Sequence, residues 1–176
     1  MILNKKILLV VAQNGFQPDE YAKPRKILEQ AGARVFVAGK KLGQAVSAIS
    51  SKQVDIDVAL PDVIASDYDG IFFIGGPGAL TDLDNEESYK IIRQIEKEHK
   101  PFGAICISPR ILAKAGVLED KKVTGWDGDN ELSKIFDKVR AHYVRKPVVV
   151  DDKLITAWGP DAANEFGSAI LRVMTQ

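Results

Sequence analysis

The chain has 176 residues, so a single domain spanning residues 1–176 is expected, since ordinary domains hold roughly 100–200 residues. Hydrophobic residues make up 45% and charged residues 27%, which excludes disordered and disulfide-stapled classes. The 24 Lys and Arg side chains balance 24 Asp and Glu side chains, so no net field attracts nucleic acid or a membrane surface. One cysteine cannot form an internal disulfide, which favours a reducing, cytoplasmic location.

The first half of the chain is predicted to alternate strands with helices. Residues 6–12 form an apolar run without alternation, typical of a parallel strand covered on both faces and too short for a membrane span or secretory signal. A helix over residues 19–31 follows, and Pro24 is expected to kink it. The next elements are a strand over 34–38 and an edge ribbon of two strands over 45–50 and 53–58.

The second half continues the alternation and contains a cysteine at a strand end. A buried strand over 69–74 runs into a glycine loop at 75–78, and a surface helix over 84–98 follows. A short strand over 101–105 ends at Cys106, after which Ser108 and Pro109 supply an N-cap and a first-turn proline for a helix to Ala115. The remaining predicted elements are a strand over 122–125, a helix over 130–136, a strand pair over 143–150 and 154–157, and a helix over 162–174. This order indicates an α/β sandwich with a mostly parallel sheet.

Ligands of open α/β sheets bind at the carboxyl ends of the strands, which directs attention to three places. Cys106 lies between a strand and a helix, where the helix dipole and free N–H groups favour a thiolate and an oxyanion, as in a nucleophile elbow; a small buried hydrophobe is the alternative. The loop that begins Gly75-Gly76 either brings N–H groups to an anion or is simply a tight turn. Glu20, in the first helical turn, is either functional or an ordinary surface charge.

These segments together resemble one family. The motifs GFQPDE at 15–20, YDGIFFIGGPG at 68–78, GAIC at 103–106 and ITAWGP at 155–160 are similar to the ThiJ/PfpI superfamily over nearly the whole chain. The resemblance implies one flavodoxin-like three-layer sandwich (class I glutamine amidotransferase-like), a homodimer, and no metal or other cofactor. By matching position it implies that Cys106 is the reactive thiol, that Glu20 is its carboxyl partner, and that the N–H groups of Gly76 and Ile107 are oxyanion donors.

Several residues depart from the family pattern. Peptidase-like members have Cys-His-Gly at the elbow, whereas Ile107 follows the cysteine here. The deglycase branch also lacks that histidine and has a small residue after its cysteine, so this elbow looks nearer to that branch, although Ile107 is bulkier. His99 and His142, the two histidines, are expected to be surface or structural residues. Trp126 replaces a histidine of the deglycase branch and Trp158 an arginine of many members, so both are pocket candidates in a more apolar site, with core packing as the alternative.

Arg110 is a further pocket candidate. It lies four residues after Cys106, so it can share the helix face nearest the thiol and favour a thiolate; an arginine facing solvent or a dimer partner is the alternative.

Three functions remain open from the sequence. The first is a cysteine-dependent enzyme acting on a small reactive carbonyl, as glyoxalase and deglycase members (lyases or hydrolases) are thought to do, with Cys106 as nucleophile and Glu20 as proton carrier. The second is a redox-sensing or stress-protective protein, with a Cys106 sulfinate held by protonated Glu20. The third is a non-catalytic binding module with a tryptophan-lined pocket. Peptidase activity is disfavoured, because no imidazole follows the cysteine.

Overall fold

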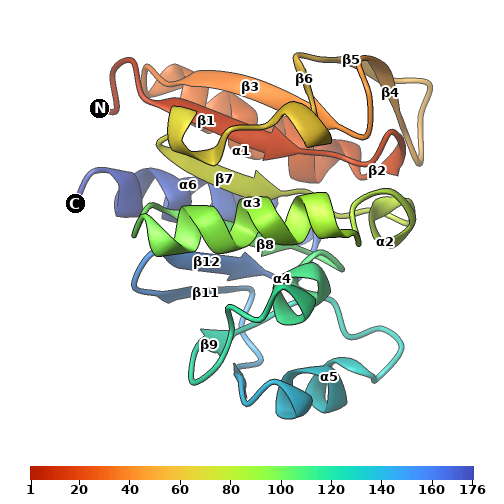
Figure 1. Cartoon of the computed structure of the whole chain (residues 1–176), viewed down its shortest axis with the longest axis vertical. Helices are drawn as coiled ribbons and strands as arrows, with labels where there is room; N and C mark the ends of the chain where they lie inside the picture. The colour runs from red at the N-terminus through yellow and green to blue at the C-terminus, as the bar shows by residue number, and fades with distance from the viewer.

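A computed structural model describes all residues 1–176, and its centre is a sheet of seven strands (Figure 1). In chain order these strands are β1 (Lys6–Val10), β3 (Arg34–Gly39), β6 (Val58–Ala59), β7 (Gly70–Phe73), β8 (Phe102–Ile105), β11 (Val148–Asp151) and β12 (Leu154–Ala157). Their spatial order is β11-β12-β8-β7-β1-β3-β6. Every neighbouring pair is parallel except β11 and β12, which form an antiparallel edge pair joined by a turn at Asp152 and Lys153.

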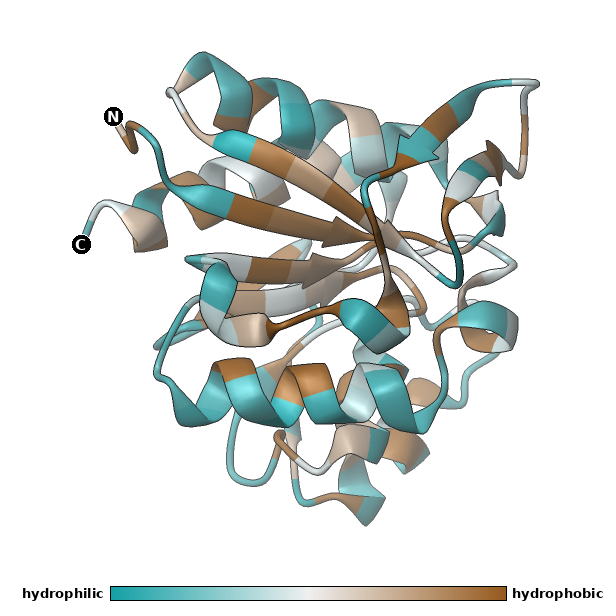
Figure 2. Ribbon diagram, turned by 45° about the horizontal axis from the view of Figure 1, so that its top comes forward, coloured by the Kyte–Doolittle hydropathy of each residue, from teal (hydrophilic) through white to brown (hydrophobic).

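Helices cover both faces of this sheet because side chains along each strand alternate between two cores. In β1, Leu8 and Val10 belong to one buried cluster and Ile7 and Leu9 to the other. The first cluster is closed by α3 (Glu86–Lys97), α4 (Pro109–Ala115) and α5 (Leu132–Lys138), and the second by α1 (Pro18–Gln30) and α6 (Ala163–Met174). Figure 2 shows the apolar strands between helices whose outer surfaces are hydrophilic. The predicted flavodoxin-like three-layer sandwich is confirmed.

Shorter elements surround the sheet. The predicted edge ribbon is β4 (Gly43–Ser47) and β5 (Gln53–Ile56), which pair antiparallel and join β2 (Asn14–Phe16) in a separate sheet. The remaining short elements are α2 (Ala79–Asp82), the parallel pair β9 (Lys122–Val123) and β10 (His142–Tyr143), and 3-10 turns at Leu60–Asp62, Ala65–Asp67 and Pro160–Ala162. No helix combines the length and apolar character needed to cross a membrane.

Three local predictions need correction. The helix predicted from residue 130 begins at Leu132, because Asn130 has a left-handed φ of 60° and the Asp127 carboxylate accepts the Leu132 N–H at 2.9 Å. Ser108 stands at the N-cap position of α4 but its hydroxyl makes no cap; it donates instead to the Ile74 carbonyl at 2.8 Å. The strand predicted over residues 143–150 is two strands in separate sheets, β10 (His142–Tyr143) and β11 (Val148–Asp151). Pro24 is buried inside α1, which runs to Gln30, and the kink expected there stays a prediction.

Candidate active site

Cys106 follows β8 directly and occupies a strained backbone conformation. Its φ of 64° lies in the left-handed region, which costs a residue with a side chain about 1–2 kcal/mol. Two hydrogen bonds hold this conformation: the Cys106 N–H donates to Ala157 of β12 at 2.9 Å, and the Cys106 carbonyl accepts the Trp126 N–H at 2.7 Å. The half-buried side chain lies at the carboxyl edge of the sheet, between β8 and α4, as a nucleophile elbow requires.

Glu20 reaches the same edge from the first turn of α1. The Gln17 side chain caps that helix by accepting the N–H groups of Asp19 and Glu20. The Glu20 side chain is fully buried, and its Oε2 accepts the Gly75 N–H at 2.9 Å. The other carboxyl oxygen, Oε1, is buried without a geometrically ideal partner, although the carboxyl lies close enough to the Cys106 side chain for each to shift the other's pKa. Glu20 therefore has an oxygen free to take up a proton beside the sulfur.

Gly75 makes this close approach possible. A Cβ at position 75 would lie 2.5 Å from the Cys106 Cβ and 2.6 Å from Glu20 Oε2, so any side chain would displace both reactive groups. The carbonyl of Gly75 accepts the Gln17 N–H at 3.0 Å, which ties the loop after β7 to the start of α1. The glycine is required here for space.

Two backbone N–H groups act on the thiol. The amides of Gly76, which has a φ of +118°, and of Ile107 both lower the pKa of Cys106. Their role as oxyanion donors stays a prediction. Partial positive charge at these amides stabilises either a thiolate or an oxyanion that develops next to the sulfur.

The net effect on the thiol is opposite to the sequence-based expectation of a stabilised thiolate. Burial and the neighbouring Glu20 carboxylate raise the pKa of Cys106 well above its usual range, and the two N–H groups offset only part of this. Burial also raises the pKa of Glu20, from 4.5 to about 7. Two negative charges this close in a buried site are unfavourable, so Cys106 and Glu20 titrate as a coupled pair that holds at least one proton at neutral pH.

Arg110 is buried and paired, so the prediction of a solvent-facing side chain is wrong, whereas its predicted role beside the thiol and the alternative of a dimer contact stay predictions. It is only 9% exposed, its guanidinium donates to both carboxylate oxygens of Asp129 at 2.7 and 2.9 Å, and it stacks 5.6 Å from the centre of the Trp126 ring. Trp126 is 38% exposed and adjoins the elbow through its N–H. Trp158 directly follows β12, packs half-buried on the core that contains α1 and α6, and donates its indole N–H to Asp161 at 3.0 Å.

The two histidines lie away from Cys106. His99 is exposed and precedes β8, at the opposite end of that strand, while His142 is exposed in β10. Nowhere do three or more His, Cys, Asp and Glu side chains converge in a way that would hold a metal ion. The elbow therefore has one carboxyl group and backbone amides with which to move protons and stabilise charge.

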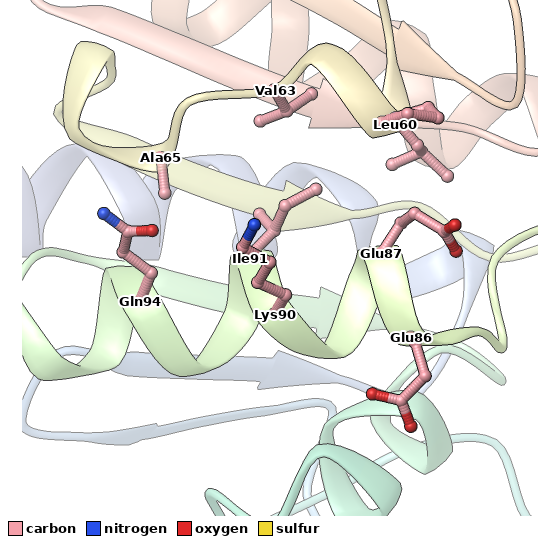
Figure 3. A pocket seen from close by; sticks show the side chains of 9 residues that line it. Leu60, Val63, Ala65, Glu86, Glu87, Lys90, Ile91 and Gln94 are labelled. Atoms are coloured by element: carbon pink, nitrogen blue, oxygen red, sulfur yellow. The ribbon is translucent and has the colours of Figure 1, made fainter.

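The cavity that Figure 3 shows is separate from this site. It has a volume of about 370 Å³ and lies between α3 and the 3-10 turns that precede β7. Leu60, Val63 and Ile91 form its apolar part, and Glu86 and Glu87 lie at its rim. None of its lining residues comes from the elbow, from the glycine loop or from α1.

Comparison with known proteins defines the class of protein that carries this site. Residues 5–173 match the DJ-1/PfpI family, so the chain belongs to that family and the resemblance to ThiJ/PfpI proteins is confirmed. A ThiJ/PfpI domain protein from Brachyspira murdochii has a similar structure, with a TM-score of 0.91, 27% identity and 98% coverage of both chains. Drosophila melanogaster DJ-1beta is similar with a TM-score of 0.84 and 28% identity, covering 99% of this chain and 92% of its own.

Particular relatives resemble the chain along its length. An uncharacterised protein of Methanocaldococcus jannaschii is 32% identical over 172 residues, which cover 97% of this chain and 83% of the relative. A Bacillus subtilis protein named "Putative cysteine protease YraA" is 30% identical over 174 residues, covering 98% of this chain and 99% of the relative.

Sequence reasoning missed two residues that shape the site. Asp129 is the partner of Arg110, but 19 residues separate them, and no local pattern connects residues so far apart. Gln17 caps α1 and so holds the turn that carries Glu20. Its place directly before Pro18, at the start of a predicted helix, was a usable signal for a cap.

Proposed function

We propose that this chain is a cysteine-dependent enzyme that acts on small reactive carbonyls of the α-oxoaldehyde class. The observation that carries the proposal is the pairing of Cys106, at a left-handed elbow, with the buried Glu20, whose pKa of about 7 suits general acid–base chemistry near neutral pH. Family membership supports a reactive cysteine at this position. The carbonyl substrate is our inference from the groups that surround the sulfur.

The first step is addition of Cys106 to the aldehyde. The Glu20 carboxylate accepts the thiol proton while the sulfur forms a bond to the carbonyl carbon, and the π-electron pair moves onto oxygen. The N–H groups of Gly76 and Ile107 are the donors proposed for that oxyanion, and their effect on the pKa of the neighbouring thiol supports this role. Protonated Glu20 then returns its proton to the oxygen, which gives a neutral hemithioacetal.

The second step is proton transfer between the two substrate carbons. Glu20 removes the proton from the carbon bonded to sulfur, and the proton of that carbon's hydroxyl moves to the neighbouring carbonyl oxygen by way of an enediol. Glu20 then delivers its proton to the neighbouring carbon, which gives a thioester of a 2-hydroxy acid. Water hydrolyses the thioester and regenerates the thiol. Methylglyoxal and one water thus become lactate, without an oxidant or reductant. One carboxyl group suffices, and Glu20 is the carboxyl group at the sulfur.

The elbow is less suited to peptide hydrolysis. An amine leaving group needs a proton from a general acid, and Ile107 stands where an imidazole would have to act. His99 and His142 are exposed on other parts of the fold. The protease name of the Bacillus subtilis relative therefore makes peptidase activity an outcome to test alongside carbonyl turnover.

The test is methylglyoxal consumption with lactate formation, in the wild type and in Cys106→Ser and Glu20→Gln. We expect turnover that rises with pH through about 7, as Glu20 ionises, and that is lost in both variants. Glu29→Gln is the matched control, because Glu29 is an exposed carboxylate on the same helix that pairs with Arg25. Undiminished turnover in Cys106→Ser, or cleavage of a fluorogenic peptide without methylglyoxal turnover, would overturn the proposal.

A further inference from the structure

The segment from Gly125 to Asp129 lies against the elbow and is fastened to it at two points. At its start, the Trp126 N–H donates to the Cys106 carbonyl at 2.7 Å, and a Cβ on Gly125 would lie 3.2 Å from that same oxygen. At its end, Asp129 receives two hydrogen bonds from the Arg110 guanidinium, at 2.7 and 2.9 Å. We call residues 125–129 the strap. On the elbow side the two partners of the strap are Cys106 itself and Arg110, four residues later.

Arg110 is held as part of a built structure. It is nine-tenths buried, and a charged group buried to this extent needs a partner of opposite charge. Its Nε has no hydrogen-bond partner. Hydrogen bonding from Arg110 lowers the pKa of Asp129, so the pair is ionised at neutral pH. Its Nη2 also lies 3.4 Å from the Trp126 carbonyl. Since Asp129 occupies the guanidinium in bidentate fashion, Arg110 offers no free cation to a substrate carboxylate.

The Trp126 indole is fixed between two neighbours. The Arg110 guanidinium lies 5.6 Å from the ring centre on one side. Gly128 packs so closely that a Cβ there would lie 2.7 Å from the indole Cε2, so a side chain at 128 would push the ring away. Trp126 is nevertheless 38% exposed to solvent. The backbone of Trp126 adjoins that of Cys106 through the 2.7 Å hydrogen bond, so this partly exposed ring stands on a segment that borders the elbow. An aromatic surface held in one orientation there is suited to bind an apolar group of a substrate.

We infer that Trp126 is a specificity-determining wall of the Cys106 site and that Arg110, through Asp129, is the residue that positions it. This inference deepens the proposed function and rests on it for the substrate class: α-oxoaldehydes with an apolar or aromatic substituent are preferred over anionic ones. Arg110 acts on the reaction only through the placement of the indole.

The test uses alkylation of Cys106, because alkylation requires no turnover and the chain has one cysteine. Rates are measured by intact mass for two reagents with the same reactive group, iodoacetamide and N-phenyliodoacetamide. The rate with N-phenyliodoacetamide is divided by the rate with iodoacetamide. This ratio is then divided by the same ratio measured for the thiol of glutathione, and the result is called the selectivity. We expect a selectivity of about three- to tenfold for the wild type, the gain that an aromatic pair provides. Trp126→Ala should reduce it to about one.

Variants of the ion pair separate positioning from a general structural role. Arg110→Met should lower the selectivity while the iodoacetamide rate stays within about twofold, and Arg110→Lys should restore part of it. Asp129→Asn tests the same pair from its exposed side, where misfolding is a small risk. Arg145→Met is the matched control, because Arg145 stacks 5.6 Å from the Tyr143 ring outside the strap and should leave the selectivity unchanged.

The outcomes distinguish this inference from the proposed function. A wild-type selectivity of one, or a selectivity that survives Trp126→Ala, overturns the inference even if methylglyoxal is turned over. Equal changes in both alkylation rates on Arg110→Met would assign Arg110 a structural role only. If methylglyoxal is not turned over but the alkylation selectivity is present and depends on Trp126, the proposed function is overturned and the role of Trp126 at the Cys106 site is retained.

Discussion

The cost of ionising Glu20 inside the protein should be measurable as a pH dependence of stability that Glu20→Gln removes. The pKa of this carboxyl is 4.5 for an ordinary glutamate and about 7 in the folded chain. Below about pH 4.5 both folded and unfolded states are protonated and no cost arises. As the pH rises from about 4.5 to about 7, the unfolded state releases its proton first, so the wild type loses stability over that window.

The magnitude follows from the size of the shift. A shift of about 2.5 pKa units at about 1.36 kcal/mol per unit gives a loss of about 3 kcal/mol between about pH 4 and pH 8. For a chain of this length that loss corresponds to about 6–12 °C in Tm. Glutamine keeps an oxygen to accept the Gly75 N–H but cannot ionise, so its stability should lack this decline.

Urea unfolding of both proteins at several pH values provides the assay. The quantity of interest is the difference between the two curves, because every other titrating group is common to both proteins. Glu29→Gln, which alters an exposed carboxylate on the same helix, should run parallel to the wild type. If the Glu20→Gln curve also runs parallel to the wild type, the Glu20 pKa is not raised and the reasoning about the coupled pair fails.

Three further changes probe the geometry of the elbow. Gly75→Ala should abolish Cys106 reactivity and destabilise the fold, because the new Cβ would stand 2.5 Å from the Cys106 Cβ; alkylation and unfolding measure both effects. Cys106→Gly should be more stable than Cys106→Ala by about 1 kcal/mol, because only glycine adopts the left-handed φ of 64° without strain. Ser108→Ala should cost about 1–2 kcal/mol in urea unfolding, because the buried Ile74 carbonyl loses its donor.

Each of these changes has a contrasting result that would count against it. Gly43→Ala is the control for the reactivity effect of Gly75→Ala: nothing lies within 4 Å of the added Cβ, so reactivity should persist even though alanine is strained at the Gly43 φ of +115°. Equal stability of the glycine and alanine variants at position 106 would mean that the elbow is unstrained. Ser168→Ala removes an exposed hydroxyl bonded to its own helix, and a loss as large as that of Ser108→Ala would refute the role of burial.

The sequence predicted the frame of the fold because its central strands are continuous apolar runs. β1, β7 and β8 are buried on both faces, so each stands in a run of apolar residues without polar alternation, and a glycine loop follows β7 and Cys106 follows β8. The meeting of Cys106 with the glycine loop follows from parallel strands ending at one edge. The start of α5 was misplaced because Asp127 caps it from five residues away, a contact that the loop conformation decides.

The direction of the pKa shift at Cys106 could not be predicted from the sequence. The direction of the Cys106 pKa shift depends on how deeply the thiol is buried and on the approach of Glu20 from a different element, 86 residues earlier in the chain. A helix start and free amides predicted a lowered value, and burial outweighed them. The pairing of Arg110 with Asp129 was likewise beyond the sequence, because the two residues come from different segments of the chain.

The coupling of Cys106 and Glu20 is best measured as the pH dependence of Cys106 alkylation by iodoacetamide, in the wild type and in Glu20→Gln. We expect an apparent pKa above the roughly 8.5 of a free thiol in the wild type, and a lower value in Glu20→Gln, because the carboxylate charge that opposes the thiolate is gone. Identical profiles for the two proteins, or a wild-type pKa well below that of a free thiol, would mean that Cys106 and Glu20 do not titrate as a pair.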